Sequence, residues 1–117
     1  MISGIGVDVE EVRRFRENFR DRAFTRLLFT GREIAYCMKK KEPYIHFAGK
    51  FCAKEAVIKA SSKSLGARDI EVVNSVSGRV SIYVKGKKQA GIHCSIAHTE
   101  GQAVAFVVWE KYGNLSR

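Results

Sequence analysis

The sequence is poor in the features that anchor a protein in a membrane or cross-link it. Its three cysteines are odd in number and lack the C-x-x-C spacing of metal sites, so neither a disulfide framework nor a zinc site is supported. They are Cys37, Cys52 and Cys94. No apolar run approaches the roughly 20 residues of a membrane span, and the first residues lack the charged and apolar regions of a signal peptide. We therefore expect a cytoplasmic protein whose thiols are reduced and mostly buried.

Acidic residues and proline are also scarce. Asp and Glu number 12 against 21 Lys and Arg, which gives a formal net charge of +9. This excess favours an anionic partner, which could be nucleic acid, a membrane surface, a polyanionic small molecule or an acidic protein. The single proline, Pro43, predicts a turn before the helix that follows it. A chain of 117 residues with 45% apolar content fits one domain, which we expect to span residues 1–117.

The first residues predict a strand with two unlike faces. Residues 2–9 alternate, with apolar side chains on one face and Gly4, Gly6 and Asp8 on the other. The apolar residues are Ile5, Val7 and Val9. Glycine in a strand indicates close approach of a ligand or another backbone, so Asp8 would project from a face that is otherwise free of side chains. Alternatively, Asp8 and Glu11 form a D-x-x-E cap for the next helix.

Two helical segments are predicted next. Residues 10–26 carry phenylalanines at helical spacing, which indicates a helix with aromatic side chains in the core and an exposed rim of arginines. The arginines are Arg13, Arg14, Arg16, Arg20, Arg22 and Arg26. This rim is either a solvated face or a docking surface for an acidic partner. Thr30 and Glu33 form a T-x-x-E capping box, which predicts a second helix that ends at about Met38.

Residues 47–59 predict a helix with a carboxylate on its apolar side. At about 100° per residue, Glu55 falls near the middle of an apolar arc. The arc consists of Tyr44, Phe47, Ala48, Phe51 and Ile58. A carboxylate that faces a core is costly unless it is protonated, paired or bound to a metal. Lys59, one turn further on, can reach the same site, although such i, i+4 pairs are also common on solvated faces.

Four strand-like runs complete the chain. They span residues 69–74, 79–85, 92–97 and 103–110. Short turns between successive runs predict an antiparallel meander, and the fold class is therefore α+β. His98 follows the third run, where it has access to a cleft or serves a structural role. His46, on the central helix, is expected to be structural or exposed.

Two carboxylates in this sequence suit a hard divalent cation. Asp8 ends a strand and Glu55 lies on a helix, with Lys59 one turn beyond it. Mg²⁺ keeps several waters and commonly takes only one or two protein carboxylates, so these two could suffice if a diphosphate completes the coordination shell. Lys59 would then offset charge on a leaving phosphate.

The chain resembles the holo-acyl-carrier-protein synthase type of 4′-phosphopantetheinyl transferase. The matching segments are GIGVD at residues 4–8 with Arg14 after it, AGKFCAKEA at 48–56 with Lys59, and HCSIAHT at 93–99. They occur in the family's order over nearly the whole chain. The resemblance implies the 4′-phosphopantetheinyl transferase fold, with a small antiparallel sheet packed on a long central helix. It also implies a homotrimer with active sites between subunits.

The resemblance further implies an activity. The phosphopantetheine arm of coenzyme A is transferred to a serine of an acidic apo acyl carrier protein in fatty acid or related biosynthesis, and adenosine 3′,5′-bisphosphate is released. Asp8 and Glu55 match the Mg²⁺ ligands, and with Lys59 they match the catalytic residues. The residues that match coenzyme A contacts are Lys50, Lys54, Lys59 and His98. The residues that match the carrier-protein docking helix are Arg13, Arg14 and Arg20.

Two rival functions remain open from the sequence. One is a Mg²⁺-dependent nuclease in which Asp8, Glu55 and Lys59 act on a phosphodiester. The other is a non-enzymatic, basic RNA-binding module, which is less favoured because a cluster of exposed aromatic residues is not apparent. We expect neither a membrane nor nucleic acid as the partner. Lys50 stands where the family more often has arginine, and lysine lacks the bidentate grip of arginine on phosphate.

Overall fold

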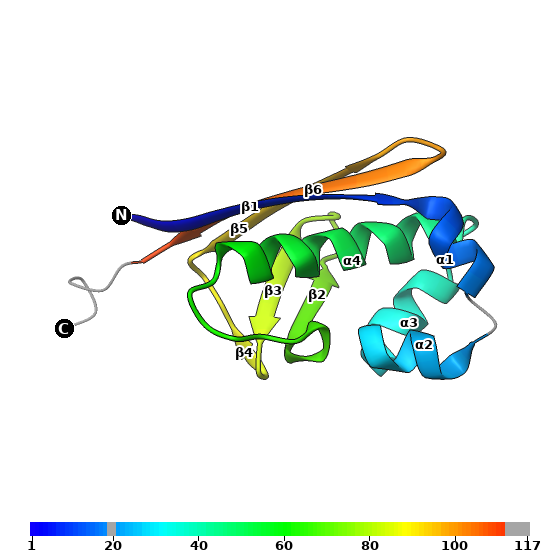
Figure 1. Cartoon of the computed structure of the whole chain (residues 1–117), viewed down its shortest axis with the longest axis horizontal. Coiled ribbons are helices and arrows are strands. Elements are labelled where there is room, and N and C mark those ends of the chain that lie inside the picture. The colour runs from blue at the N-terminus through cyan, green and yellow to red at the C-terminus, as the bar shows by residue number, and fades with distance from the viewer. Residues whose placement is uncertain (19–20, 112–117) are drawn as a thin grey trace.

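A long helix, α4 (Pro43–Ala60), runs through the middle of the protein, and the other elements pack around it (Figure 1). The structure is a computed structural model that describes residues 1–18 and 21–111. A three-stranded antiparallel sheet covers one side of α4. Its strands, in spatial order, are β1 (Ile2–Glu11), β6 (Gln102–Glu110) and β5 (Ile92–His98).

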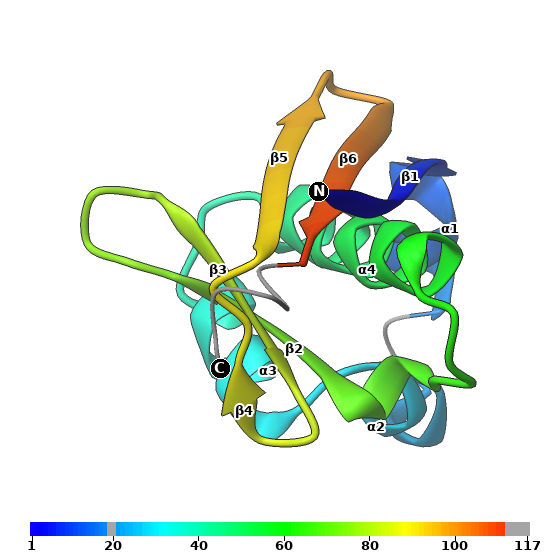
Figure 2. The same ribbon diagram turned by 90° about the vertical axis from the view of Figure 1, so that its left-hand side faces the viewer.

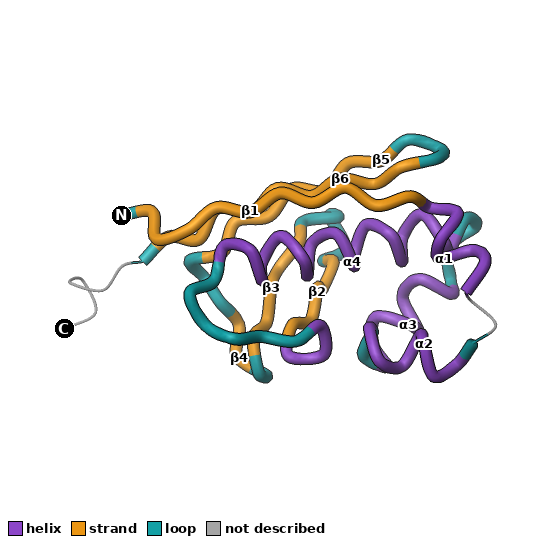
Figure 3. The backbone as a smooth tube through the Cα atoms, viewed as in Figure 1, coloured by secondary structure: helices purple, strands orange, loops and turns teal. Residues whose placement is uncertain are grey.

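The remaining elements enclose other sides of α4, as a view turned by 90° shows (Figure 2). A second antiparallel sheet consists of β2 (Ile70–Asn74), β3 (Val80–Val84) and the short β4 (Lys87–Lys88), and a 3-10 turn (Ala67–Asp69) precedes it. Three short helices gather near the N-terminal end of α4: α1 (Val12–Asn18), α2 (Arg22–Leu28) and α3 (Gly31–Met38) (Figure 3). The predicted α+β class is confirmed.

The expectation of a single meander is wrong. In the described part of the chain β3 and β5 belong to different sheets, and the last strand pairs with the first. Asp8 lies opposite Ala105 in this β1–β6 pair, and Val7 lies opposite Phe106. Turn residues report only which neighbouring strands can pair, so they carry no information about a pair that joins the two ends of the chain.

The glycine face of β1 packs directly on α4. A Cβ atom built on Gly4 would lie 1.9 Å from the carbonyl oxygen of Ala60, and one on Gly6 would lie 1.9 Å from that of Ala56. Only glycine allows the strand and helix backbones to come this close. The glycines predict close approach of a ligand or another backbone to β1, and the structure shows that this neighbour is the backbone of α4. Asp8 lies inside β1, so the alternative in which it caps the following helix is wrong.

Helix α4 is buried on most of its circumference, which differs from the predicted amphipathic pattern. Its buried residues include Lys50, Cys52 and Lys54 as well as the apolar positions. Two sheets and three helices surround the helix, so no single apolar arc decides which residues are inside. Glu55 is half-buried and Lys59 is exposed, so this part of α4 is its more open side.

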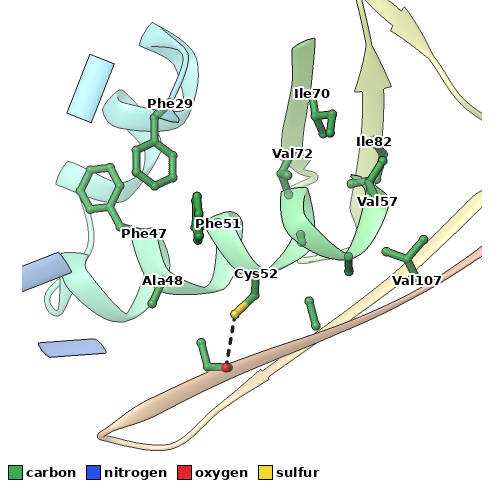
Figure 4. Packing of buried hydrophobic residues seen from close by; sticks show 14 of the residues in the cluster. Phe29, Phe47, Ala48, Phe51, Cys52, Val57, Ile70, Val72, Ile82 and Val107 are labelled. Carbon is green, nitrogen blue, oxygen red and sulfur yellow. Dashed lines mark hydrogen bonds between the residues drawn. The ribbon is translucent and has the colours of Figure 1, made fainter. Parts of the chain in front are cut away.

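Aromatic side chains from the short helices pack against α4, as the sequence predicts (Figure 4). The Phe29 and Phe47 rings lie 4.9 Å apart, and those of Phe15 and Phe51 lie 5.5 Å apart. All four are buried. Further along α4, the Cys52 thiol donates a hydrogen bond to the carbonyl oxygen of Ala103 at 3.3 Å. The core thus continues from the aromatic cluster to the sheet.

The predicted helix at residues 10–26 is two helices. Asp21 caps α2, because its side chain accepts a hydrogen bond from the Phe24 amide at 3.1 Å. The predicted docking residue Arg20 lies outside the described residues. For α3 the prediction is confirmed: Thr30 is the N-cap, and Glu33 completes the capping box.

Candidate active site

Strand β1 forms one edge of the first sheet, and a cluster of charged residues lies there next to α4. The Lys59 ammonium lies 3.3 Å from Asp8 Oδ1 and donates to the Val7 carbonyl oxygen at 2.9 Å. Asp8 also lies near the Cys52 thiol, whose pKa is raised to about 12 by burial first and then by the Asp8 and Glu10 charges. Residues 52, 55 and 59 share one side of a helix. Glu55 therefore lies between two residues that interact with Asp8.

We call this set, Asp8 and Glu10 of β1 with Glu55 and Lys59 of α4, the acidic edge. Glu10 was missed from the sequence, although the alternation that runs through Gly4, Gly6 and Asp8 continues to it. Burial and the neighbouring Asp8 carboxylate raise the pKa of Glu10 to about 7, and Arg14 opposes this rise. Two carboxylates here repel each other, so the edge attracts positive charge.

The acidic edge fits a divalent cation. Lys59 pairs with Asp8 Oδ1, but Asp8 Oδ2 is buried and has no hydrogen-bond partner among the described residues, which is costly unless a ligand or ion satisfies it. Glu55 likewise forms no ion pair within residues 1–18 and 21–111. No group of three or more His, Cys, Asp or Glu side chains in that part of the chain could hold a metal alone. Two carboxylates completed by ligand oxygens match the habit of Mg²⁺.

The opposite edge of the sheet, at β5, borders a cavity of about 210 Å³ whose wall includes one lysine and two histidines. Lys50 and His98 both line it, as do His46 and Asn74, and we call it the basic cavity. His98 is exposed at the end of β5. Two of the four residues predicted to contact coenzyme A, Lys50 and His98, therefore share one cavity.

Lys50 is more constrained than the sequence suggests. The residue is only 3% exposed, and its ammonium donates to the Val72 carbonyl oxygen at 2.8 Å and to Asn74 Oδ1 at 2.6 Å. The same nitrogen lies 4.3 Å from the centre of the Tyr36 ring. Burial lowers the pKa of Lys50. The ammonium thus supplies positive charge to the cavity while most of its donors are engaged.

Lys54 does not fit the predicted role as a coenzyme A contact. Its side chain is fully buried, and its ammonium lies 2.7 Å from Glu33 Oε1. It also donates to the carbonyl oxygens of Leu28 and Ala67, at 2.8 and 3.0 Å. An ammonium has three donors, and all three are satisfied inside the protein. Lys54 therefore links α4 to α2, to α3 and to the 3-10 turn that precedes the second sheet.

The predicted docking residues Arg13 and Arg14 lie on α1, at the end of β1. Arg14 forms an ion pair with Glu10 at 3.0 Å, and its guanidinium lies 5.2 Å from the centre of the Phe51 ring. Arg13 is exposed and lies 3.9 Å from Glu17. Arg14 is thus held next to the acidic edge, whereas Arg13 points a charge into solvent.

Comparison with known proteins identifies the family of this chain. Residues 4–107 match the model of the 4′-phosphopantetheinyl transferase superfamily. The chain belongs to this superfamily. A holo-[acyl-carrier-protein] synthase of Thermodesulfovibrio yellowstonii is 38% identical over 112 residues, which cover 92% of this chain and 98% of the relative. One of Chlorobaculum tepidum is 38% identical over 114 residues, which cover 91% and 97%.

Solved structures of the superfamily share the fold. A holo-(acyl-carrier-protein) synthase of Bacillus anthracis, in complex with CoA (3′,5′-ADP), matches with a TM-score of 0.81 and 32% identity, over 95% of this chain and 98% of that one. The enzyme of Neisseria meningitidis matches with a TM-score of 0.81 and 27% identity, over 95% and 100%. The chain is therefore a phosphopantetheinyl transferase of the holo-[acyl-carrier-protein] synthase type.

Three of the remaining expectations concern redox state, membranes and nucleic acid. The cysteines are free, and burial raises the pKa values of Cys37 and Cys94 to about 12 and about 11. Over the described ranges, no helix combines the length and apolarity needed to cross a bilayer. The aromatic cluster that an RNA-binding module would expose is in the core, around Phe15 and Phe51.

Proposed function

We propose that this protein transfers the 4′-phosphopantetheine group of coenzyme A to a serine of an apo acyl carrier protein and releases adenosine 3′,5′-bisphosphate. Superfamily membership over residues 4–107 carries this proposal. The two charged sites support it, because an acidic edge and a basic cavity suit a substrate with both a diphosphate and a further phosphate group.

The acidic edge would bind the diphosphate. Asp8 and Glu55 would hold Mg²⁺, which when bound supplies positive charge to the diphosphate oxygens. Lys59 is half-exposed and borders Asp8, so its ammonium can turn toward a phosphate and offset the charge that develops on the leaving group. A carboxylate of this edge could accept the proton of the serine hydroxyl.

The basic cavity would bind the nucleotide through His98 and Lys50. His98 is exposed and free to approach a phosphate. Lys50 acts mainly as a fixed positive charge, because Val72 and Asn74 already accept two of its hydrogen bonds. A point charge without bidentate geometry is the contribution that lysine can make where the family more often has arginine.

The carrier protein would dock on α1. Arg14 lies beside the acidic edge, so an acidic protein bound there would bring its serine close to the diphosphate. Arg13, one residue before it, adds exposed positive charge to the same helix. We place the reaction in fatty acid or related biosynthesis in the cytoplasm, where free thiols such as Cys94 persist.

The active protein would be a homotrimer with its active sites between subunits. The acidic edge lies at β1 and the basic cavity at β5, which are opposite edges of one sheet, with β6 and α4 between them. One coenzyme A molecule could use both if the β1 edge of one chain met the β5 edge of another. This separation of the two half-sites supports an assembly of several chains.

The outer face of the same sheet supports this assembly. Ile5, Val7 and Val9 are 61%, 52% and 55% exposed, and Phe106, opposite Val7, is 47% exposed. None of the described elements covers this face (Figure 1). Contiguous exposed apolar side chains on a sheet are typical of protein–protein contacts.

Mass spectrometry of the carrier protein tests the proposed reaction. An apo carrier protein incubated with this protein, Mg²⁺ and coenzyme A is expected to gain the mass of one phosphopantetheine group. Omission of coenzyme A is the control. The proposal would be wrong if several apo carrier proteins gained no mass, and cleavage of nucleic acid under the same conditions would favour the nuclease instead.

A further inference from the structure

His46 lies in the wall of the basic cavity, although the sequence favours a structural or exposed role for it. It is in the first turn of α4 and is half-buried. The centre of its ring is 6.1 Å from that of His98 and 6.1 Å from that of Tyr36. The two imidazoles come from different elements and meet edge to face. They therefore converge on the same hollow.

Basic residues from three elements lie around His46. Lys50 lies on the same helix, His98 comes from β5, and Lys40 from the turn after α3 lies 4.6 Å from the centre of the Tyr36 ring. No carboxylate lines the cavity among the described residues. The nearest acidic groups that act on Lys50 are Glu33 and Glu71, and both are engaged, with Lys54 and Arg32. Without a ligand, this positive charge has no counter-charge inside the cavity.

We propose that His46 is a ligand of the nucleotide 3′-phosphate in the basic cavity, and that it takes up a proton when this phosphate binds. This inference rests on the proposed function. The diphosphate of coenzyme A is accounted for at the acidic edge, where carboxylates require a cation between them and the phosphate. The phosphomonoester carries up to two negative charges and needs direct cationic partners, which the cavity provides.

The charge state of His46 depends on the ligand. Burial first, and then the charges of Lys40, His98 and Lys50, lower its pKa, so His46 is neutral in the empty cavity near neutral pH. A phosphate next to the ring reverses the sign of the local field and favours the imidazolium form. Binding then takes up a proton, so the contribution of His46 to affinity is largest at low pH and is lost as the pH rises.

Isothermal titration calorimetry with adenosine 3′,5′-bisphosphate tests this inference. Titrations in two buffers with different ionisation enthalpies give the number of protons taken up on binding. Because the phosphate itself titrates near pH 6, the quantity to compare is the difference between wild type and His46→Gln. His93→Gln is the matched control, since His93 lies on β5 outside this cavity and pairs with Glu110 at 2.9 Å.

Near neutral pH, we expect binding to His46→Gln to consume fewer protons than binding to wild type, by at most about one. At about pH 6, His46→Gln should bind adenosine 3′,5′-bisphosphate roughly tenfold more weakly. The difference in affinity should shrink toward about pH 8, and His93→Gln should behave as wild type. Adenosine 5′-monophosphate, which lacks the 3′-phosphate, should show no difference between the proteins. His46→Arg, which carries a permanent positive charge, should bind tightly without the additional proton uptake, and it decides the matter if His46→Gln fails to fold.

Equal proton uptake by wild type, His46→Gln and His46→Arg would overturn the role of His46 while leaving the proposed function intact. A wild-type protein that binds no adenosine 3′,5′-bisphosphate at any pH would overturn both. An effect of His46→Gln on adenosine 5′-monophosphate equal to that on the bisphosphate would also contradict the assignment, because His46 would then not act on the 3′-phosphate.

Discussion

At the scale of single residues, the carboxylates of Asp8 and Glu55 in the acidic edge are not fully paired by other described residues. One oxygen of Asp8 is buried without a hydrogen-bond partner, and Glu55 forms no ion pair among the described residues. A folded protein retains such groups where a ligand or ion satisfies them. Glu55 can therefore be changed with little effect on packing, so its proposed role in catalysis can be tested separately from any role in folding.

Replacement of Glu55 by Gln is expected to lower kcat for phosphopantetheine transfer by about a hundredfold or more, because an amide is a weaker Mg²⁺ ligand than a carboxylate. The thermal unfolding temperature should stay close to that of wild type, since Glu55 makes no described ion pair. Glu42→Gln, an exposed change just before the same helix, is the control. A Glu55→Gln protein with the wild-type kcat would show that Glu55 is not a metal ligand.

Replacement of Arg14 by Glu is expected to raise the KM for the carrier protein about tenfold or more and to change the KM for coenzyme A much less. The reversed charge repels an acidic partner and also breaks the ion pair with Glu10. Initial-rate measurements in which each substrate is varied separately give both constants. If the two KM values rose equally, Arg14 would not be a docking residue.

At the scale of helices and strands, the buried pair of Lys54 and Glu33 connects three elements. Glu33 caps α3, accepts a hydrogen bond from the Val72 amide of β2 at 2.7 Å, and lies 2.7 Å from Lys54 of α4. Burial lowers the pKa of Lys54, and Glu33 opposes this change. Lys54, which the family resemblance assigns to coenzyme A binding, therefore helps to hold α4 against α3 and β2.

Replacement of Lys54 by Met is expected to lower the free energy of unfolding by about 3–5 kcal/mol, because the Glu33 carboxylate is left buried without its counter-charge. Urea denaturation gives this value. Lys50→Met is the comparison, and its cost should be smaller because Lys50 has no carboxylate within ion-pair distance in the part of the chain that the structure describes. If Lys54→Met were as stable as wild type, the pair would not hold these elements together.

Local signals in the sequence predict most of the elements but not how they are arranged. The Thr30 capping box and the glycines of β1 act over a few residues or one backbone contact, and both predictions are confirmed. The Asp21 cap that divides residues 10–26 into two helices is also local and was overlooked. The pairing of β1 with β6, and the meeting of His46 with His98, depend on distant segments. Periodicity reports nothing about such contacts.

At the scale of the whole molecule, the two proposed half-sites differ in charge. Among the described residues, the acidic edge combines carboxylates with Lys59, and Arg14 lies beside it. The basic cavity has Lys50, His46 and His98 and, within the same part of the chain, no carboxylate. Neighbouring strands are about 4.8 Å apart, so β1 and β5 are separated by roughly 10 Å, and α4 packs across the sheet between the two sites. Joining of two edges from neighbouring chains would complete each site.

Complementation between two inactive variants tests the shared active site most directly. Asp8→Asn removes the acidic edge and leaves the basic cavity, whereas His98→Ala does the reverse. Each variant alone should transfer little phosphopantetheine at a coenzyme A concentration well below KM. Trimers formed from equal amounts of both should recover roughly a quarter of the wild-type rate, because about one interface in four pairs two intact half-sites. A mixed protein no more active than the average of the two variants would contradict an active site built from two chains.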